Sequence, residues 1–322
     1  MYQQKDKKSF LDQAIEFILL LALIFLVRTF FFGLYQVPTP SMETTMLVGD
    51  RFFADKLTYW FRSPRRGEII AFNDPEFEYS KNKFVSLFQK YVWGPSNWTK
   101  RVIAVPGDIV EGKVENGKPV IYVNGKLLDE PYVNRLPLIH LWTDDPEKLR
   151  AQIETELSAV MSRGRMYGLD IEQLLMQKWA QKTTFRSYDP AASYIDQPFY
   201  RIDEKRIIKN QQQKPELLYP ATQINQANDR QAVAGNKRYW NKSDTFYIEL
   251  AADEYWCMGD NRLGSKDCRF LGPIKADQIH GRIVFRIWSL DSDESWAAVD
   301  LLKHPIDFWT RLRYSRFMQP VY

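Results

Sequence analysis

The sequence predicts a mainly β protein, an antiparallel β-sheet domain that follows one N-terminal membrane helix and is interrupted by a partly helical insertion. The first observation behind this prediction is a long apolar segment near the N-terminus. The second is a set of short apolar runs between turn residues, and the third is helical periodicity confined to the middle of the chain. With 322 residues, 45% of them hydrophobic, the chain can bury a substantial core.

Residues 14–33 are nearly all apolar, and their two charged residues, Glu16 and Arg28, lie near the two ends. At 1.5 Å per residue, about 20 residues cross the roughly 30 Å hydrocarbon layer of a bilayer. Three lysines among the first eight residues favour a cytoplasmic N-terminus. We therefore expect residues 1–13 to form a cytoplasmic tail, residues 14–33 to form a transmembrane anchor, and the rest of the chain to lie outside.

A cleavable secretory signal is the alternative interpretation of this segment. The residues that follow the apolar run, Gly-Leu-Tyr-Gln-Val-Pro at 33–38, contain no small-x-small cleavage site. We therefore interpret the segment as an uncleaved, single-pass anchor.

Short apolar runs bounded by turn residues predict strands on both sides of the insertion. Asn116-Gly117 and Asn124-Gly125 accept positive φ angles and so favour tight hairpins between such strands. We expect residues 34–134 and 243–290 to form two parts of one catalytic β domain, with strands at 67–72, 102–105, 120–123 and 283–288.

Residues 135–242 differ in pattern and are predicted to form a cap-like insertion. Asp145-Pro146 is a favourable helix start, and Leu149, Ile153 and Leu157 follow at the spacing of an amphipathic helix. The rest of the insertion is assigned to a second helix at 169–179 and to polar loop or ribbon at 182–242.

The composition of the chain excludes some classes of partner and ligand. The net charge is +4 without a concentrated stripe of Lys and Arg, so nucleic acid is not expected. Cys257 and Cys268 have no metal-ligand spacing with the three histidines, so we expect neither a metal nor a cofactor. These two cysteines are either joined in one disulfide bridge or present as two free buried thiols.

The C-terminal tail, residues 291–322, mixes aromatic residues with arginines at 309–317. It either rests on anionic headgroups or is a solvated basic tail.

Three segments resemble a known set of motifs. Residues 37–43 read Val-Pro-Thr-Pro-Ser-Met-Glu, residues 100–108 read Lys-Arg-Val-Ile-Ala-Val-Pro-Gly-Asp, and residues 258–269 read Met-Gly-Asp-Asn-Arg-Leu-Gly-Ser-Lys-Asp-Cys-Arg. In this order, with the first segment just after a membrane helix, they resemble the motif boxes of bacterial type I signal peptidases, serine proteases with a Ser/Lys dyad. The resemblance covers residues 14–134 and 246–289 and implies the signal-peptidase-like β fold.

The residues also argue for serine–lysine chemistry without the family. A serine hydroxyl needs a base within hydrogen-bond reach, and none of His140, His280 and His304 lies in a motif-like setting. A lysine serves as base only when its pKa falls from about 10.4 to near neutrality, which costs roughly 4 kcal/mol of desolvation. Lys100 lies between Trp93, Trp98 and an apolar strand, a setting dry enough to lower its pKa.

The resemblance implies a role for each matching residue. Ser41 corresponds to the nucleophile, Lys100 to the general base, and Ser265 to a serine that orients the lysine. Thr39 corresponds to a hydroxyl that joins the Ser41 backbone N–H in the oxyanion hole, so we expect Thr39→Ala to slow turnover by about 2.7–4 kcal/mol without abolishing binding.

Two charged pairs are expected to support the site: Asp260 with Arg101, and Asp267 with Arg269. The alternative interpretation is that each pair is a surface salt bridge worth about 0–1 kcal/mol. For substrate contact we name the residues near the nucleophile and base that could form shallow apolar walls: Val37, Pro38, Met42, Met46 and Thr99.

The resemblance further implies the substrate and the place of action. The expected partners are the lipid bilayer and secretory precursors with small residues at the first and third positions before the cut, bound as extended strands. The expected location is the bacterial inner membrane, with the catalytic domain on the outer, periplasmic side. Two other functions remain open: an anchored non-enzymatic binding or assembly protein, and a self-cleaving repressor-like protease, which would carry a DNA-binding helix-turn-helix instead of a membrane helix.

Overall fold

The computed structural model describes most of the chain, and the structural statements below concern only these residues. They are 9–92, 94–142, 151–158, 183–194, 196–197, 202, 204–218, 238–240, 244–292, 294 and 296–322.

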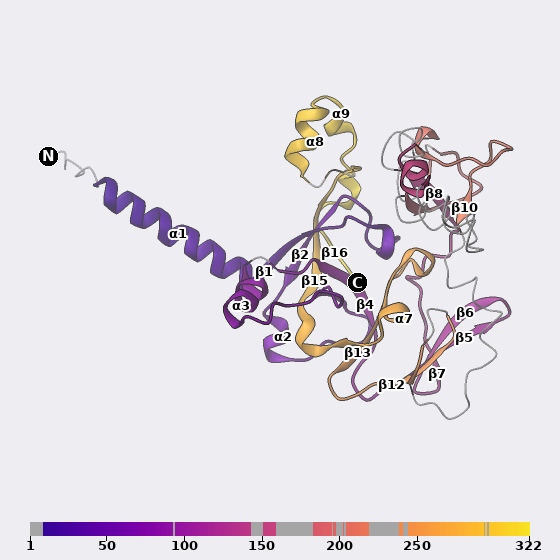
Figure 1. Ribbon diagram of the computed structural model, residues 1–322, viewed down its shortest axis with the longest axis horizontal. Helices are drawn as coiled ribbons and strands as arrows, with labels where there is room; N and C mark the ends of the chain where they lie inside the picture. The colour runs from indigo at the N-terminus through magenta and orange to yellow at the C-terminus, as the bar shows by residue number, and fades with distance from the viewer. Residues whose placement is uncertain are drawn as a thin grey trace.

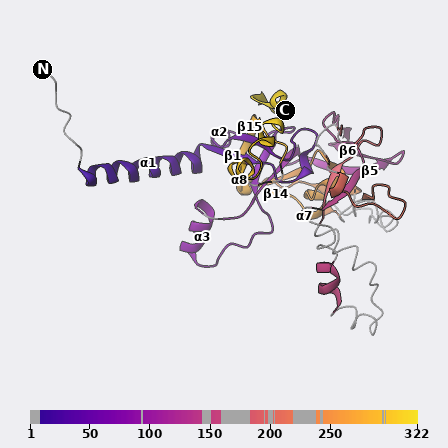
Figure 2. The ribbon, with the colours of Figure 1, turned by 90° about the horizontal axis from the view of Figure 1, so that it is seen from above.

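Helix α1 (Phe10–Phe30) projects from the β body as a single long rod (Figures 1 and 2). It is long and apolar enough to cross a membrane, with a mean hydropathy of 2.3, and none of its residues is buried in the protein. The helix begins four residues before the predicted anchor because Ser9 and Asp12 form a reciprocal cap at its N-terminus. It ends at Phe30, since the chain enters strand β1 two residues later.

An antiparallel sheet of eight strands forms the centre of the body. The strands lie in the order β1-β2-β15-β3-β4-β13-β14, and β16 pairs with β15. Their bounds are β1 Phe32–Gln36, β2 Asp50–Asp55, β3 Ile69–Asn73, β4 Asn97–Ala104, β13 Glu254–Met258, β14 Ile274–Lys275, β15 Ile279–Ser289 and β16 Gln319–Pro320.

A second antiparallel sheet has five strands in the order β11-β12-β5-β6-β7. Its two predicted hairpin turns are confirmed, because Asn116, Gly117, Asn124 and Gly125 all have positive φ, between 50° and 74°. The strands are β5 Ile109–Glu115, β6 Lys118–Val123, β7 Lys126–Leu127, β11 Arg238–Tyr239 and β12 Phe246–Glu249. Since β11 belongs to this sheet, the second part of the β domain begins by residue 238, before the predicted boundary at 243.

The two sheets share one hydrophobic core. Val102 and Ile103 of β4, Val110 of β5, Phe246 of β12 and Trp256 of β13 are all buried in it. All four predicted strands are confirmed, and they fall on β3, β4, β6 and β15. The prediction of a mainly antiparallel β fold is confirmed as well. The core fixes β4, the strand that carries the motif starting at Lys100, in the interior of the first sheet.

The described part of the insertion contains more β structure than predicted. Strand β8 (Leu138–Trp142) pairs with β9 (Thr183–Ser187) and with β10 (Leu217–Leu218). The assignment of 182–242 to loop or ribbon was therefore wrong for β9 and β10. Residues 151–158 form a helix in which Ile153 and Leu157 are buried, in agreement with the predicted stripe. Asp145-Pro146, Leu149 and the predicted helix at 169–179 lie outside the described residues.

Three arginines of the C-terminal tail form ion pairs with aspartates. Arg311 contacts Asp300 at 2.7 Å, Arg313 contacts Asp291 at 2.6 Å, and Arg316 contacts Asp50 at 2.8 Å. The first two pairs lie within the tail, whereas Arg316 joins the tail to β2, and Arg313 also donates to the backbone oxygen of Val48 at 2.9 Å.

Short helices fill the connections between strands. The α-helices are α2 Thr58–Phe61, α3 Lys83–Tyr91, α7 Cys268–Leu271, α8 Ala297–Lys303 and α9 Asp307–Thr310. The 3₁₀ turns are η1 Pro40–Met42, η2 Glu204–Arg206, η5 Arg262–Gly264, η6 Ala276–Gln278 and η7 Tyr314–Arg316. The turn η1 and the end of β13 bring the first and third sequence motifs beside β4.

Candidate active site

Ser41 lies at the centre of the 3₁₀ turn η1. Pro40 takes the first turn position, where its fixed φ is compatible with a helical start. Asn261, which follows β13, holds this turn from behind: its backbone N–H donates to Ser41 O and its side chain donates to Pro40 O, both at 3.1 Å. The backbone on either side of the Ser41 hydroxyl is therefore fixed by the third motif.

Lys100 meets Ser41 from strand β4. Its Nζ lies 2.9 Å from Ser41 Oγ and 3.1 Å from the carbonyl oxygen of Thr99. The side chain is only 5% exposed because β4 is an interior strand, paired with β3 on one side and β13 on the other. The predicted nucleophile and base are thus in direct contact, although they are 59 residues apart in the chain.

Burial lowers the pKa of Lys100 from 10.5 to about 8, and the nearby carboxylate of Asp267 opposes this effect. Desolvation dominates because the amine has left water and the apolar core surrounds its strand. The ring of Trp98 also covers the amine, with the ring centre 5.6 Å from Nζ. Trp93, the other tryptophan expected beside Lys100, lies outside the described residues.

Thr39 and Ser265 both lie at the site, with different contacts. The Thr39 hydroxyl lies 3.4 Å from Ser41 Oγ, in front of the nucleophile. The Ser265 hydroxyl donates to Asp267 Oδ2 at 2.8 Å, whereas the family resemblance implied that it orients Lys100. Gly259 explains how Ser265 comes so close: a Cβ there would lie 2.4 Å from Ser41 O and 2.3 Å from Ser265 Oγ.

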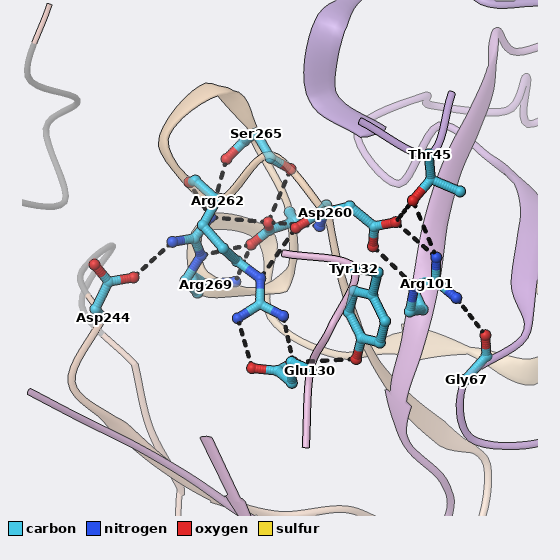
Figure 3. A network of polar contacts seen from close by, with 12 residues as sticks. Thr45, Gly67, Arg101, Glu130, Tyr132, Asp244, Asp260, Arg262, Ser265 and Arg269 are labelled. Atoms are coloured by element: carbon cyan, nitrogen blue, oxygen red, sulfur yellow. Dashed lines mark hydrogen bonds and ion pairs between the residues drawn. The ribbon is translucent and has the colours of Figure 1, made fainter. Parts of the chain in front are cut away.

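The first predicted charged pair, Arg101 with Asp260, is buried in a network of polar contacts (Figure 3). Arg101 donates to Asp260 through two nitrogens, at 2.8 and 2.6 Å, and Thr45 donates to the same carboxylate at 2.5 Å. Both members of the pair are almost fully buried. A surface salt bridge is therefore the wrong description, and the pair locks the strand next to Lys100 to the third motif.

The second pair, Asp267 with Arg269, is also fully buried, with Nε 2.9 Å from Oδ1. Asp267 additionally accepts from the backbone N–H of Gly259 at 3.0 Å, and Arg269 contacts Asp244 at 2.6 Å. Figure 3 shows a further bidentate pair between Arg262 and Glu130. The sequence analysis gave no role to Asp244, Arg262 or Glu130. Arg262 belongs to the third motif, but its partner Glu130 is 132 residues away in the chain.

The residues proposed for substrate contact divide into two groups. Val37, Met42 and Met46 are buried in a core cluster under the nucleophile turn, and each methionine is only 1% exposed. Pro38 is exposed and Thr99 is half-buried. The methionines therefore present almost no surface to a substrate, and Pro38 and Thr99 are the accessible members of the set.

Glu43, two residues after Ser41, is a fully buried carboxyl group that the sequence analysis left without a role. Burial raises its pKa from 4.5 to about 7, and Arg186 and Arg313 oppose the increase. Arg186 belongs to β9 of the insertion. The insertion therefore reaches the back of the nucleophile turn.

Cys257 and Cys268 are free and buried, with the Cys257 backbone N–H donating to Cys268 Sγ at 3.0 Å. Of the two possibilities left open by the sequence, the structure contains two thiols. They lie in the core that adjoins Lys100.

The family described as "Signal peptidase, peptidase S26" matches residues 11–153 and 192–288. Signal peptidase I of Aquifex aeolicus is 33% identical over 278 residues, which is 84% of this chain and 81% of that protein. Probable signal peptidase I-2 of Synechocystis sp. is 39% identical over 34% of this chain and 44% of that protein. Signal peptidase I P of Bacillus subtilis subsp. natto is 33% identical over 41% and 60%, so the chain spans about half the length of these last two relatives.

A crystal structure of a signal peptidase I from Enterococcus faecalis V583 matches 69% of this chain and 97% of that chain. The identity is 16% and the TM-score is 0.27, so this superposition supports no argument about the fold. The family match covers most of the chain and includes Ser41, Lys100 and the buried charged pairs beside them. This chain belongs to the signal peptidase family, peptidase S26.

Proposed function

We propose that the chain is a membrane-anchored serine endopeptidase that removes signal peptides from secreted precursor proteins, with Ser41 as nucleophile and Lys100 as general base. One observation carries the proposal. A buried lysine, with its pKa lowered to about 8, lies 2.9 Å from a serine hydroxyl that is itself nearly inaccessible to bulk water.

In the proposed reaction, Ser41 Oγ attacks the carbonyl carbon of the scissile bond while the neutral Lys100 amine takes the hydroxyl proton. Lys100 then returns this proton to the leaving amine, which departs and leaves an ester on Ser41. Water, activated by the same amine, hydrolyses the ester and regenerates the hydroxyl. The backbone N–H of Ser41 and the hydroxyl of Thr39 are the proposed donors to the negatively charged oxygen.

The buried charges have a supporting role in this proposal. Asp260 and Arg101 hold β4 against the third motif, and Asp267 and Arg269 fix the loop that carries Ser265 and Gly259. These contacts keep the Lys100 amine aimed at Ser41 without placing an acceptor carboxylate on it. A carboxylate directly on the amine would raise its pKa and weaken the base.

The location follows from helix α1. A helix of 21 residues spans a bilayer, and the lysines before it favour a cytoplasmic N-terminus, which puts the β body on the outer side. Ser41 follows the end of α1 by 11 residues, so the nucleophile is near the membrane surface, where the end of a signal peptide emerges. The substrate is proposed to bind extended, with small residues beside Ser41, as the resemblance to type I signal peptidases implies.

The test uses the full chain in lipid vesicles together with a signal-peptide-bearing precursor. Wild-type protein and the Lys266→Ala control should release the mature product, whereas Ser41→Ala and Lys100→Ala should not. Thr39→Ala should cleave about 10²–10³ times more slowly, since it removes one proposed oxyanion donor. Equal processing by all these variants would remove the assignment of Ser41 and Lys100, and no processing by the wild type would make an anchored binding protein the better description.

A further inference from the structure

Helix α3 carries its apolar side chains on the outside. Phe84, Leu87 and Phe88 lie on one face at i, i+3 and i+4, and they are 85%, 59% and 54% exposed. The polar residues Ser86 and Gln89 face inward and are half-buried, and Gln89 accepts a hydrogen bond from Ser80 N. A surface helix of a soluble domain has the opposite arrangement, with its apolar stripe on the core.

This helix is placed beside the end of the membrane anchor. Figure 1 shows α3 at the level of the last turns of α1, and in Figure 2 it projects from the β body on one side, apart from α1. A cavity of about 550 Å³ is lined by Phe25 and Arg28 of α1 and by Gln89 and Lys90 of α3. The two helices therefore flank one space at the level where α1 meets the body.

The apolar surface continues from α1 onto the neighbouring short helix α2. Phe31, which caps the C-terminus of α1, contacts the ring of Trp60 with centroids 6.0 Å apart. Trp60 and the adjacent Phe61 are both exposed. Exposed aromatic side chains thus surround the point where the anchor leaves the membrane, and an apolar surface continuous with a membrane helix has lipid as its nearest apolar medium.

We propose that α3 lies on the outer surface of the bilayer, with Phe84, Leu87 and Phe88 at the boundary between headgroups and acyl chains. The helix contains Lys83 and Lys90 and no acidic residue, so its polar side suits the anionic lipid surface. Long lysine side chains can reach the headgroups while the apolar face is immersed. The bilayer is therefore a better occupant of this face than a second copy of the chain.

The contact has a consequence for the active site. Helix α3 lies in the connection between β3 and β4, and β4 begins at Asn97, only three residues before Lys100. A second membrane contact at α3, in addition to α1, holds the start of this strand at the bilayer. The orientation of the β body is then fixed by two points, whereas α1 alone would leave it free to rotate about the anchor.

The experiment measures lipid contact and does not depend on the proposed peptidase activity. The full chain is reconstituted in vesicles of phosphatidylethanolamine and phosphatidylglycerol, with an environment-sensitive fluorophore on Phe84→Cys or Phe88→Cys. Lys126→Cys, at an exposed position on β7 of the second sheet, far from α1 and α3 in Figure 1, is the control. The native Cys257 and Cys268 are buried and stay unlabelled.

Labels at 84 and 88 should emit at shorter wavelength and lose intensity when lipids brominated near the headgroup are included, and the label at 126 should do neither. A second variant adds Leu87→Asp and Phe88→Asp to the Phe84→Cys chain and should return the label at 84 to water. The proposal is overturned if labels at 84 and 126 respond alike to brominated lipid. It is also overturned if the label at 84 is shielded from aqueous iodide but insensitive to brominated lipid, which would indicate a protein partner or a second copy.

Discussion

The active-site region and helix α3 both break the usual distribution of side chains, in opposite directions. Around Ser41, full charges are buried: Arg101, Asp260, Asp267 and Arg269 have almost no exposed surface. On α3, large apolar side chains are exposed instead. Burying a charge and exposing an apolar surface both cost free energy, and a different partner offsets each cost. In the first region the partner is an opposite charge inside the protein, and in the second it is lipid outside the protein.

Within the active-site region, a second comparison isolates what makes a lysine a base. Lys100 and Lys266 both lie over the ring of Trp98, at 5.6 and 5.8 Å from its centre. Lys266 is half-exposed and pairs with Glu76 at 2.6 Å. Lys100 is buried and meets a hydroxyl instead of a carboxylate. Loss of water and the neutral partner, and not the aromatic ring, distinguish the proposed base.

The largest expected effect tests that distinction directly. Lys100→Arg keeps a positive charge that cannot be lost, so precursor cleavage should fall by about 10²–10⁴-fold. Lys266→Arg should cleave at the wild-type rate. In the wild type, kcat/KM should rise by about tenfold per pH unit up to about 8 and then level, because the amine is neutral only above its lowered pKa. An activity independent of pH between 6 and 9 would remove Lys100 from the role of base.

The next effect in size concerns the buried pairs. Arg101→Met leaves the Asp260 carboxylate buried beside a single hydroxyl, that of Thr45, and should lower the free energy of unfolding by about 3–5 kcal/mol. The pair between Lys303 and Glu294 is exposed, so Lys303→Met should lower the free energy of unfolding by only about 0–1 kcal/mol. Unfolding of both variants in detergent, followed by near-UV circular dichroism, gives the two values. If both variants lost similar amounts of free energy of unfolding, the buried pair would be no more important for stability than the exposed one.

Glu43 differs from the buried carboxylates of the two pairs, because the cations Arg186 and Arg313 only partly offset the cost of burying its charge. Its pKa is about 7 in the folded chain and about 4.5 when unfolded, so between these values the folded chain binds a proton that the unfolded chain lacks. Stability should therefore fall as the pH rises through this window. Glu43→Gln cannot ionise and should gain up to about 3 kcal/mol over the wild type by pH 7.5 and nothing at pH 4.

Thermal unfolding of both proteins at a series of pH values checks this prediction. If the stabilities of the two proteins changed in parallel from pH 4 to 8, the Glu43 carboxylate would be fully compensated by nearby cations. It would then resemble the paired carboxylates of Asp260 and Asp267.

Much of the fold could be predicted because its signals are local. The strand at 102–105 is a continuous apolar run, and the Asn-Gly turns at 116–117 and 124–125 need only their own backbone preferences. Helix α3 also has local signals, a cap at Asn82 and apolar residues at i, i+3 and i+4, although no helix was predicted there. Strand β9, Thr-Thr-Phe-Arg-Ser, was missed because its polar sequence becomes a strand only through pairing with β8.

The site was predictable as a set of residue types but not as a set of contacts. The contact between Ser41 and Lys100 followed from the motifs and from the dry surroundings of the lysine. The contacts of Gly259 and Asn261 with the Ser41 backbone join residues about 220 positions apart. Nothing local to either residue indicates which carbonyl it will meet, since the two sheets must first assemble.

Gly259 provides the smallest effect and the closest test of how tightly the buried region is packed. Gly259→Ala places a Cβ 2.4 Å from Ser41 O, a backbone atom that Asn261 already holds, so the nucleophile turn must shift. We expect a loss of stability of about 1–3 kcal/mol and a lower kcat for precursor cleavage. Gly281→Ala in β15 is the matched control, because its Cβ would meet nothing closer than 3.4 Å and should change neither quantity. If Gly259→Ala cleaved at the wild-type rate, the turn that carries Ser41 would tolerate displacement, and the alignment of Ser41 with Lys100 would depend on β4 alone.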